Sequence, residues 1–193
     1  MREINYQKYF WQSNLVRLRG VQENDWESHY INRFDTPARL LLNYEVELPP
    51  TIKEAHQAND TFLDFDLSRG RIMFTIETLD GVNIGGINLN SIDERNGTFS
   101  IGMQIDGIER GKGYGTSAMR IVLRYAFLER RLNKYYGSVL EGNIASASVL
   151  KKIGCKEEGV RRQMVYSNGN YHDEIMFGLT KDEFLSIPNN INL

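Results

Sequence analysis

A glycine-rich segment, RGKGYG at residues 110–115, most constrains how this chain can fold. Alternating polar and apolar residues at 98–105 precede it, and apolar residues at helical spacing over 116–130 follow it. The glycines therefore lie where a strand turns into a helix. The first N–H groups of a helix have no partners within it, and glycines let a phosphate approach them closely. The segment predicts a cradle for a phosphate or pyrophosphate.

Two familiar phosphate-binding motifs do not fit this segment. A P-loop needs Ser or Thr after its lysine, whereas Lys112 is followed by Gly113. A dinucleotide fingerprint needs a third glycine where this chain has Thr116. An ordinary glycine-rich turn before a helix remains an alternative. The pattern left is R-x-x-G-x-G, formed by Arg110, Gly113 and Gly115.

Composition is that of one ordinary globular domain. The 193 residues, 41% hydrophobic and 25% charged, suffice for a substantial core. We expect a single domain over residues 1–193, with its core at about 15–183. The formal net charge of −2 gives no broad attraction to nucleic acid or to an anionic membrane. Neither is therefore expected as a partner.

Cysteine and histidine usage argues against a disulfide and against a metal site. Cys155 is the only cysteine, and His29, His56 and His172 are scattered without ligand spacing. No apolar run approaches the roughly 20 residues of a membrane span. The N-terminus has no signal-peptide core. A reducing, cytoplasmic location is expected.

In the first half of the chain, periodicity predicts a strand at 15–19 and two helices. The first helix, capped by Asn24 or Asp25, runs to Phe34 and is broken by the sequence at 35–37. Residues 39–48 are not assigned. The second helix starts after Thr51, which forms a capping-box pattern with Glu54, and runs to residues 65–66, ending near 68–70.

The second half begins with three strands at 71–79, 82–89 and 98–105, joined by Asp-Gly and Asn-Gly hairpin turns. Gly85 and Gly86 inside the second strand predict a bulge or a close backbone approach. After the helix at 116–130 we expect a strand at 135–140, a helix at 145–153 ending at Gly154, and a hairpin of strands at 160–166 and 171–179. The tail, 187–193, is expected to be loose.

This order of elements, together with the R-x-x-G-x-G loop, resembles the GNAT N-acetyltransferase superfamily from about residue 15 to 183. Three further motifs sharpen the resemblance. E-x-N-x-x-S at 141–146 is similar to the entry to the family's second cofactor helix. V-L-x-K-x-G at 149–154 and N-G-x-Y-H-D at 168–173 resemble its ribosomal-protein (alanine/serine) branch. The resemblance implies an α/β (α+β) single-domain fold with a mixed, mostly antiparallel central sheet and helices on both faces.

The resemblance also implies acetyl-CoA as cofactor, with CoA as product. Its pantetheine arm would lie where the strand before the loop splays from the following strand, and the loop amides would hold the pyrophosphate. Helix capping is an equal interpretation for Asn143, and an inert first-turn serine for Ser146. The implied cofactor-binding residues are Gln104, Ile105, Arg110, Gly111, Lys112, Gly113, Tyr114, Gly115, Thr116, Asn143 and Ser146.

Two catalytic residues common in the family are missing. Leu150 stands where many members have a tyrosine acid, and Ser100 where a glutamate is common. By resemblance to the ribosomal branch, Ser146 is the remaining group to stabilise the departing thiolate. Cys155, where the family has Phe, is expected to pack in the core. The base is left open among Glu77, Glu141 and Glu174.

The implied activity is acetyl transfer to a primary amine by direct attack, of the ribosomal-protein N-terminal type. Acidic residues in the expected acceptor region could instead attract a polyamine or another small amine, although a solvated helix face explains most of them: Glu45, Glu47, Glu54, Asp60, Asp64 and Asp66. A catalytically silent CoA-binding sensor is a third alternative. The sequence gives neither the acceptor nor strict acetyl specificity. A homodimer is compatible with it.

Overall fold

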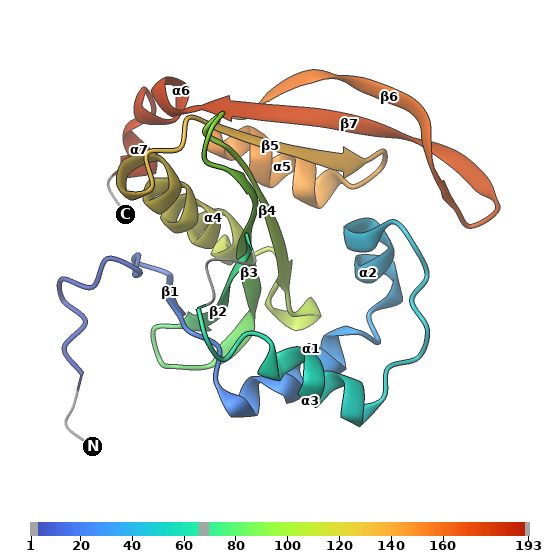
Figure 1. The fold of residues 1–193 in the computed structure, drawn as a ribbon, viewed down its shortest axis with the longest axis horizontal. Coiled ribbons are helices and arrows are strands. Elements are labelled where there is room, and N and C mark those ends of the chain that lie inside the picture. Colours follow the sequence, from blue (N-terminus) through green and yellow to red (C-terminus); the bar gives the residue numbers. More distant parts are fainter. Residues whose placement is uncertain (1–3, 66–69, 192–193) are drawn as a thin grey trace.

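The computed structural model describes residues 4–65 and 70–191, and a mixed sheet of seven strands lies at its centre (Figure 1). The strand order is β1-β2-β3-β4-β5-β7-β6, and β4–β5 is the parallel pair among antiparallel neighbours. The mostly antiparallel sheet is therefore confirmed. The strands are β1 (Val16–Arg19), β2 (Ile72–Thr78), β3 (Asn83–Asp93), β4 (Thr98–Ile105), β5 (Lys134–Leu140), β6 (Lys156–Ser167) and β7 (Asn170–Thr180).

Helices, turns and loops form the rest of the described chain. None of the helices in the described ranges is long and apolar enough to cross a membrane. The helices are α1 (Trp26–Asn32), α2 (Thr36–Asn43), α3 (Ile52–Asp60), α4 (Tyr114–Arg124), which continues as a π-helical turn (Tyr125–Glu129), α5 (Ile144–Ile153), α6 (Lys181–Leu185) and α7 (Pro188–Ile191), with short 3-10 turns at Glu23–Asp25 and Gly107–Glu109.

Helices cover both faces of the sheet, as expected. On one face, Phe74 and Ile87 join the buried core that includes Ile121 of α4. On the opposite face, the Thr75 hydroxyl donates to Asp25 at 2.8 Å, and Gly86 lies beside His29 of α1. Because successive strand residues point to opposite faces, these contacts separate α4 and α5 from α1, α2 and α3 (Figure 1).

Strands β4 and β5 diverge soon after they meet. Their parallel pairing consists of Thr98 with Lys134 and Phe99 with Tyr135, although β4 continues to Ile105. Each strand is instead paired along its length on its other side, β4 with β3 and β5 with β7. Beyond these pairs the two strands separate (Figure 1), and the space between them is called the gap below.

Both features predicted for the paired glycines are present in β3. A Cβ at Gly85 would lie 2.2 Å from the Gln104 carbonyl oxygen, so β3 and β4 approach too closely there for any side chain. The register of β2 against β3 also shifts between Ile76 and Glu77, next to this position.

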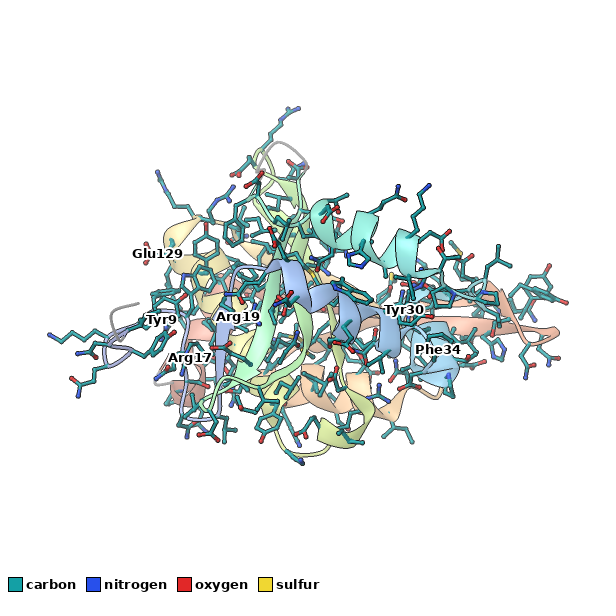
Figure 2. All side chains as sticks on the ribbon, turned by 90° about the horizontal axis from the view of Figure 1, so that it is seen from below. Tyr9, Arg17, Arg19, Tyr30, Phe34 and Glu129 are labelled. Atoms are coloured by element: carbon teal, nitrogen blue, oxygen red, sulfur yellow. The ribbon has the colours of Figure 1, made fainter. Side chains whose placement is uncertain are left out.

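The N-terminal segment packs on the molecule. Trp11 lies 4.7 Å, centroid to centroid, from both Phe74 and Tyr125, and the Tyr9 hydroxyl donates to the Leu18 carbonyl at 3.3 Å. Figure 2 shows Tyr9 at the opposite end of the molecule from Phe34, which follows α1. The segment around Tyr9 therefore lies far from the end of α1.

In the first half of the chain the break at 35–37 is present, but one helix was not predicted and another ends earlier than predicted. The break at 35–37 also starts a helix: Asp35 Oδ1 accepts from the Ala38 N–H at 3.2 Å and caps α2, which covers part of the unassigned segment 39–48. The second predicted helix ends at Asp60, where Thr61 is its C-cap. Turns replace its predicted end, and residues 66–69 lie outside the described residues.

The boundaries in the second half differ at several ends. Helix α4 begins at Tyr114, within the glycine motif, and strand β6 begins at Lys156, before the predicted 160. The expectation of a loose tail is wrong over Pro188–Ile191, because α7 is anchored by a fully buried Asn190. Its amide donates to the Ile153 carbonyl at 2.9 Å, and its Oδ1 accepts from Arg120 at 3.0 Å.

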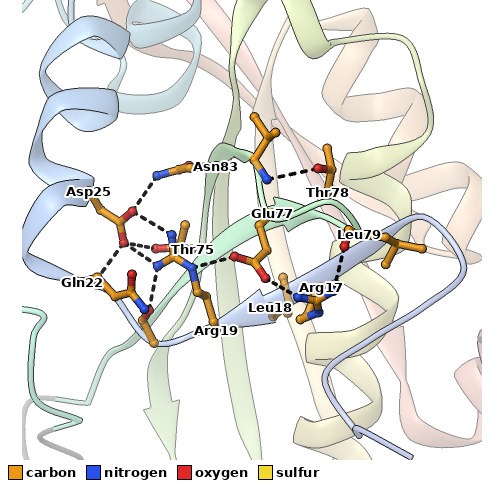
Figure 3. A network of polar contacts seen from close by, with 12 residues as sticks. Arg17, Leu18, Arg19, Gln22, Asp25, Thr75, Glu77, Thr78, Leu79 and Asn83 are labelled. Carbon is orange, nitrogen blue, oxygen red and sulfur yellow. Dashed lines mark hydrogen bonds and ion pairs between the residues drawn. The ribbon is translucent and has the colours of Figure 1, made fainter. Parts of the chain in front are cut away.

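A buried polar network joins β1, β2 and the turn before α1 (Figure 3). Asp25 was one of two residues expected to cap α1, but its side chain makes no capping hydrogen bond there. Its carboxylate accepts two hydrogen bonds from Arg19, at 2.7 and 2.9 Å, and others from the Gln22 N–H, the Thr75 hydroxyl and the Asn83 amide, each at 2.8 Å. Burial alone would raise the pKa of Asp25, but these hydrogen bonds, led by Arg19, lower it to about 2.

This network predicts a specific acid dependence of stability. Since the folded pKa of Asp25 lies below the ordinary carboxyl value of 3.8, its contribution is complete above about pH 4 and is lost as the pH falls toward 2. The shift corresponds to about 2 kcal/mol. Urea denaturation across this range should show a shallower loss of stability for Asp25→Asn than for the wild type. The exposed turn variant Asp80→Asn should keep the wild-type slope, and equal slopes for all three proteins would contradict the assignment.

Candidate functional site

A cavity of about 920 Å³ occupies the gap between β4 and β5. Residues from α2, both strands, the glycine loop, α5 and β6–β7 line it. Most of the residues predicted for the site are thus brought together. The predicted residues that line it are Gln104, Ile105, Arg110, Gly111, Gly113, Tyr114, Gly115, Thr116, Asn143 and Ser146.

The glycine loop adopts a backbone that suits anion binding. Gly111 and Gly113 have φ values of 81° and 88°, in the left-handed region that favours glycine. Gly113 is the N-cap of α4, and no side chain caps this helix end. The positive end of the helix macrodipole therefore lies at the cavity wall. Gly115 is packed so closely that a Cβ would lie 3.0 Å from the Met103 Cε.

Two basic residues of the loop are engaged elsewhere. Lys112, predicted for the site, does not line the cavity, and its ammonium pairs with Glu109 at 2.8 Å. Arg110 does line it. Its Nε donates to the Ile105 carbonyl at 2.9 Å and its Nη2 pairs with Asp35 at 2.6 Å, so the guanidinium connects the end of β4 to the N-cap of α2.

The edge of β4 that faces the gap is defined by alternation. The Gln104 carbonyl points toward Gly85 of β3, and the Asp106 N–H donates to Ile84 of the same strand at 3.0 Å. Because the backbone N–H and C=O groups of successive residues alternate in direction along a strand, those of Met103 and Ile105 point toward the gap. Of the two residues of this strand that were predicted to bind the cofactor, Ile105 has a backbone with this orientation and Gln104 does not. Met103 was missed, although alternation alone identifies it.

The Gln104 side chain has a different position from its backbone. Its Oε1 accepts from Arg39 of α2 at 2.9 Å, and its Nε2 donates to the Asn32 carbonyl of α1 at 3.2 Å. It therefore fixes the helices on the α1 face against β4.

Helix α5 brings the E-x-N-x-x-S motif to the cavity. Asn143 Oδ1 accepts from the Ser146 N–H at 3.1 Å, so its side chain caps the helix, as one of the two interpretations held. Ser146 is partly exposed in the cavity wall. Leu150, one turn later, lines the same wall and supplies no acid.

The structure separates the three candidate bases. Glu77 lies in the buried network, where it accepts from Arg17 and Arg19 at 2.8 Å each (Figure 3). It is not among the residues that line the cavity. Glu141 is exposed and contacts His172 Nδ1 at 3.1 Å. Glu174 is buried and bonded to two cavity-lining residues.

Glu174 belongs to a chain of polar side chains on the α1 face. Ser138 Oγ donates to its Oε1 at 2.6 Å, and Arg161 Nη1 donates to its Oε2 at 3.1 Å. The Tyr44 hydroxyl lies 3.3 Å from Ser138 Oγ. Tyr44 and Ser138 were missed, because neither lies in a motif and the contact joins residues 94 positions apart.

Cys155, His172 and Asp173 make contacts that stabilise the fold. Burial raises the pKa of the Cys155 thiol to about 12, so it is not a nucleophile at neutral pH. His172 Nε2 contacts the Ser167 carbonyl at 3.1 Å and Asp173 accepts from the Gln163 N–H at 2.8 Å, which stabilises the β6–β7 hairpin. Within residues 4–65 and 70–191, no three His, Cys, Asp or Glu side chains are placed to hold a metal ion.

Comparison with known proteins gives a consistent match. Residues 16–156 match the family described as "Acetyltransferase (GNAT) domain". The SPbeta prophage-derived uncharacterized N-acetyltransferase YokL of Bacillus subtilis (strain 168) is 28% identical over 177 residues, covering 91% of this chain and 95% of YokL. The putative ribosomal N-acetyltransferase YdaF of the same organism is 38% identical over 105 residues, covering 54% of this chain and 57% of YdaF.

A solved structure shares the fold across nearly the whole chain. It is the spermidine N-acetyltransferase from Vibrio cholerae in complex with CoA and spermine, with a TM-score of 0.78 and 19% identity. The match covers 90% of this chain and 99% of that protein. At this identity the likeness concerns the fold.

Proposed function

This chain belongs to the GNAT acetyltransferase family, and on that premise we propose that it transfers the acetyl group of acetyl-CoA to the N-terminal amine of a protein, as ribosomal-protein acetyltransferases do. The observation that carries this proposal is the gap between β4 and β5 with an uncapped helix N-terminus at its wall. GNAT enzymes use acetyl-CoA, which supplies the acetyl group as a thioester.

The residues around the gap fit this cofactor. The amides from Gly113 to Thr116 would hold the pyrophosphate at the N-terminus of α4, where no side chain competes. The gap-facing backbone of Met103 and Ile105 would bind the pantetheine amides, as an additional strand would. Arg110 would bind a phosphate of the cofactor by releasing Asp35, so that one anionic partner replaces another.

Ser146 is the group we assign to the departing sulfur. Ser146 lies in the cavity wall on the first turn of α5, and its hydroxyl can donate a hydrogen bond as negative charge develops. Leu150 leaves the wall without another donor one turn later. The chain therefore relies on positioning, with a single hydroxyl at the leaving group.

Charge around the cavity favours an acceptor with a single amine. The two glutamates in its lining, Glu109 and Glu158, are each paired with a lysine, at 2.8 and 2.6 Å. In the acceptor region Glu47 is contacted by Arg39 and Arg33. A polyamine carries several positive charges and is best held by uncompensated carboxylates, which these pairs do not offer. The likeness to YdaF, named a putative ribosomal N-acetyltransferase, also supports a protein N-terminus.

A polyamine acceptor is the second candidate, because the Vibrio cholerae structure that shares this fold holds spermine. A silent CoA-binding module is the third. Thiol release from acetyl-CoA should be measured with three acceptors: a peptide with a free N-terminal alanine or serine, the same peptide with its N-terminus blocked and a lysine inside, and spermidine. We expect turnover of the first. Turnover of spermidine alone would move the assignment to polyamines, and no turnover would leave a binding module.

Gly113→Asp tests the anion cradle. A Cβ at Gly113 would lie 3.5 Å from Leu15 Cδ1, an ordinary contact, so the one cost to folding is the strain of an aspartate at a φ of 88°. The control variant below carries the same strain. The carboxylate of Gly113→Asp would occupy the anion position and repel a pyrophosphate. Calorimetry should show CoA affinity reduced on the order of 100-fold, equivalent to about 2.7 kcal/mol.

Gly81→Asp is the matched control. It introduces the same carboxylate at a φ of 86° in the β2–β3 turn, where a Cβ meets nothing within 4 Å. This variant should bind CoA like the wild type. Unchanged affinity in folded Gly113→Asp would place the cradle elsewhere.

Ser146→Ala tests the hydrogen bond to the leaving sulfur. Removal of one donor to a developing charge typically lowers kcat by about 10²–10³, with little effect on CoA affinity. Ser146→Thr keeps a hydroxyl and should retain much of the activity. Steady-state kinetics with the peptide acceptor decide the point. A raised KM at unchanged kcat would assign Ser146 to ground-state binding instead.

A further inference from the structure

Four side chains from four elements form a continuous polar chain on the α1 face of the sheet. Tyr44 follows α2, Ser138 lies on β5, Glu174 on β7 and Arg161 on β6. The Tyr44 hydroxyl is 3.3 Å from Ser138 Oγ, which is 2.6 Å from Glu174 Oε1, and Arg161 Nη1 is 3.1 Å from Glu174 Oε2. Tyr44, Ser138 and Arg161 line the cavity, whereas Glu174 is 5% exposed behind them.

The chemistry of the groups fixes the direction of the hydrogen bonds. An ionised carboxylate only accepts, so the single proton of Ser138 points toward Glu174. Ser138 Oγ must then accept from the Tyr44 hydroxyl. Burial, the largest cause, raises the pKa of Tyr44, so the phenol keeps its proton at neutral pH. Its oxygen retains lone pairs for a donor within the cavity.

Tyr44 is held in place at some conformational cost. It occupies the left-handed region, with a φ of 64°, as the C-cap of α2, and its N–H donates to the Leu40 carbonyl at 2.8 Å. For a bulky residue this conformation is unfavourable, because Cβ crowds the backbone carbonyl. Strain of this kind persists where the surrounding structure imposes it, and it is common at functional sites.

We propose that Glu174 is the general base of the reaction and that Ser138 and Tyr44 carry the proton to it from the acceptor amine. This inference rests on the proposed function. The substrate ammonium donates a proton to the Tyr44 oxygen as Tyr44 passes its own to Ser138 and Ser138 passes its own to Glu174. The amine becomes neutral and nucleophilic, Glu174 becomes a carboxylic acid, and both hydroxyls are restored.

The proton balance closes over one turnover. The neutral amine forms the N–C bond as the C–S bond breaks, and the second amine proton leaves with the sulfur as a thiol. Glu174 then returns its proton to solvent through the same chain. The net products are an amide, a thiol and one proton.

Few other charged groups face Glu174. Arg161 from β6 is its ion-pair partner, Tyr44 approaches from α2, and Ser138 is the contact from β5. His172, two residues earlier on β7, is engaged with Glu141 and the Ser167 carbonyl. The single Arg161 charge compensates a carboxylate that would otherwise be buried alone.

A purely structural role, in which the chain clamps α2 to the sheet, makes different predictions. Glu174→Gln preserves the acceptor for Ser138 and the shape of the side chain but cannot take a proton. At neutral pH we expect kcat/KM for the peptide amine to fall by about 100-fold or more. The deficit should shrink above about pH 8, where the α-amine loses its proton unaided. A clamp would give a deficit that does not depend on pH.

Tyr44→Phe and Ser138→Ala interrupt the chain at its other members and should show the same convergence with wild type at high pH. Glu94→Gln is the matched control, since it breaks an ion pair of the exposed Glu94 with Arg130, neither of which lines the cavity, and it should keep the wild-type profile. CoA affinity by calorimetry should be unchanged in every variant. If Glu174→Gln does not fold, Tyr44→Phe decides the question.

The outcomes separate this inference from the function on which it rests. No turnover of the peptide by the wild type would overturn the function and the relay together. Turnover by the wild type with a normal rate and pH profile in Glu174→Gln or Tyr44→Phe would overturn the relay alone. A deficit that is constant with pH would assign these residues to the clamp.

Discussion

The divergence of β4 and β5 is the constraint on which the rest of the molecule depends. Two residue pairs join these strands before they separate, while each strand is fully paired on its other side. Every group proposed to bind or to react lies around the resulting gap. In the proposed function, α4 and α5 form the cofactor side of the cavity, and α2 and the β6–β7 hairpin form the acceptor side. Because helices from both faces of the sheet line this cavity, groups on opposite faces can act on one bond.

How much of this the sequence predicts depends on the range of the interactions. Turns, helix caps and the glycine loop are local, and the meander, the loop and the α5 motif were predicted close to their observed positions. The start of α2 was missed because Asp35 and Pro37 resemble a break, although Asp35 is also a good N-cap. The end of α3 was misplaced because a helical apolar pattern continues into turns that pack on β1 and β2, with Phe65 against Phe74.

Long-range contacts explain the remaining misses. Asn190 anchors a tail whose composition is that of a loose segment, and only its partners Ile153 and Arg120 show why it is ordered. Glu77 and Glu174 are both buried carboxylates next to arginines, yet one lies in a closed network and the other behind the cavity wall. No periodicity in a single sequence distinguishes them. Tyr44 was missed for the same reason, because its partner Ser138 lies on a strand far away in sequence.

The separation of β4 and β5 also gives the protein an unusual kind of surface. A strand edge with unsatisfied backbone groups normally invites another chain, and most proteins cover or charge it. Here the gap-facing edge that includes Met103 lies inside the fold, flanked by α2 and the glycine loop, where no second sheet can reach it. An extended molecule with amide groups, but without the width of a polypeptide sheet, can still pair with it. In the proposed function, the sheet therefore selects its cofactor by the backbone pairing that also drives aggregation, but only a single extended molecule fits beside the edge.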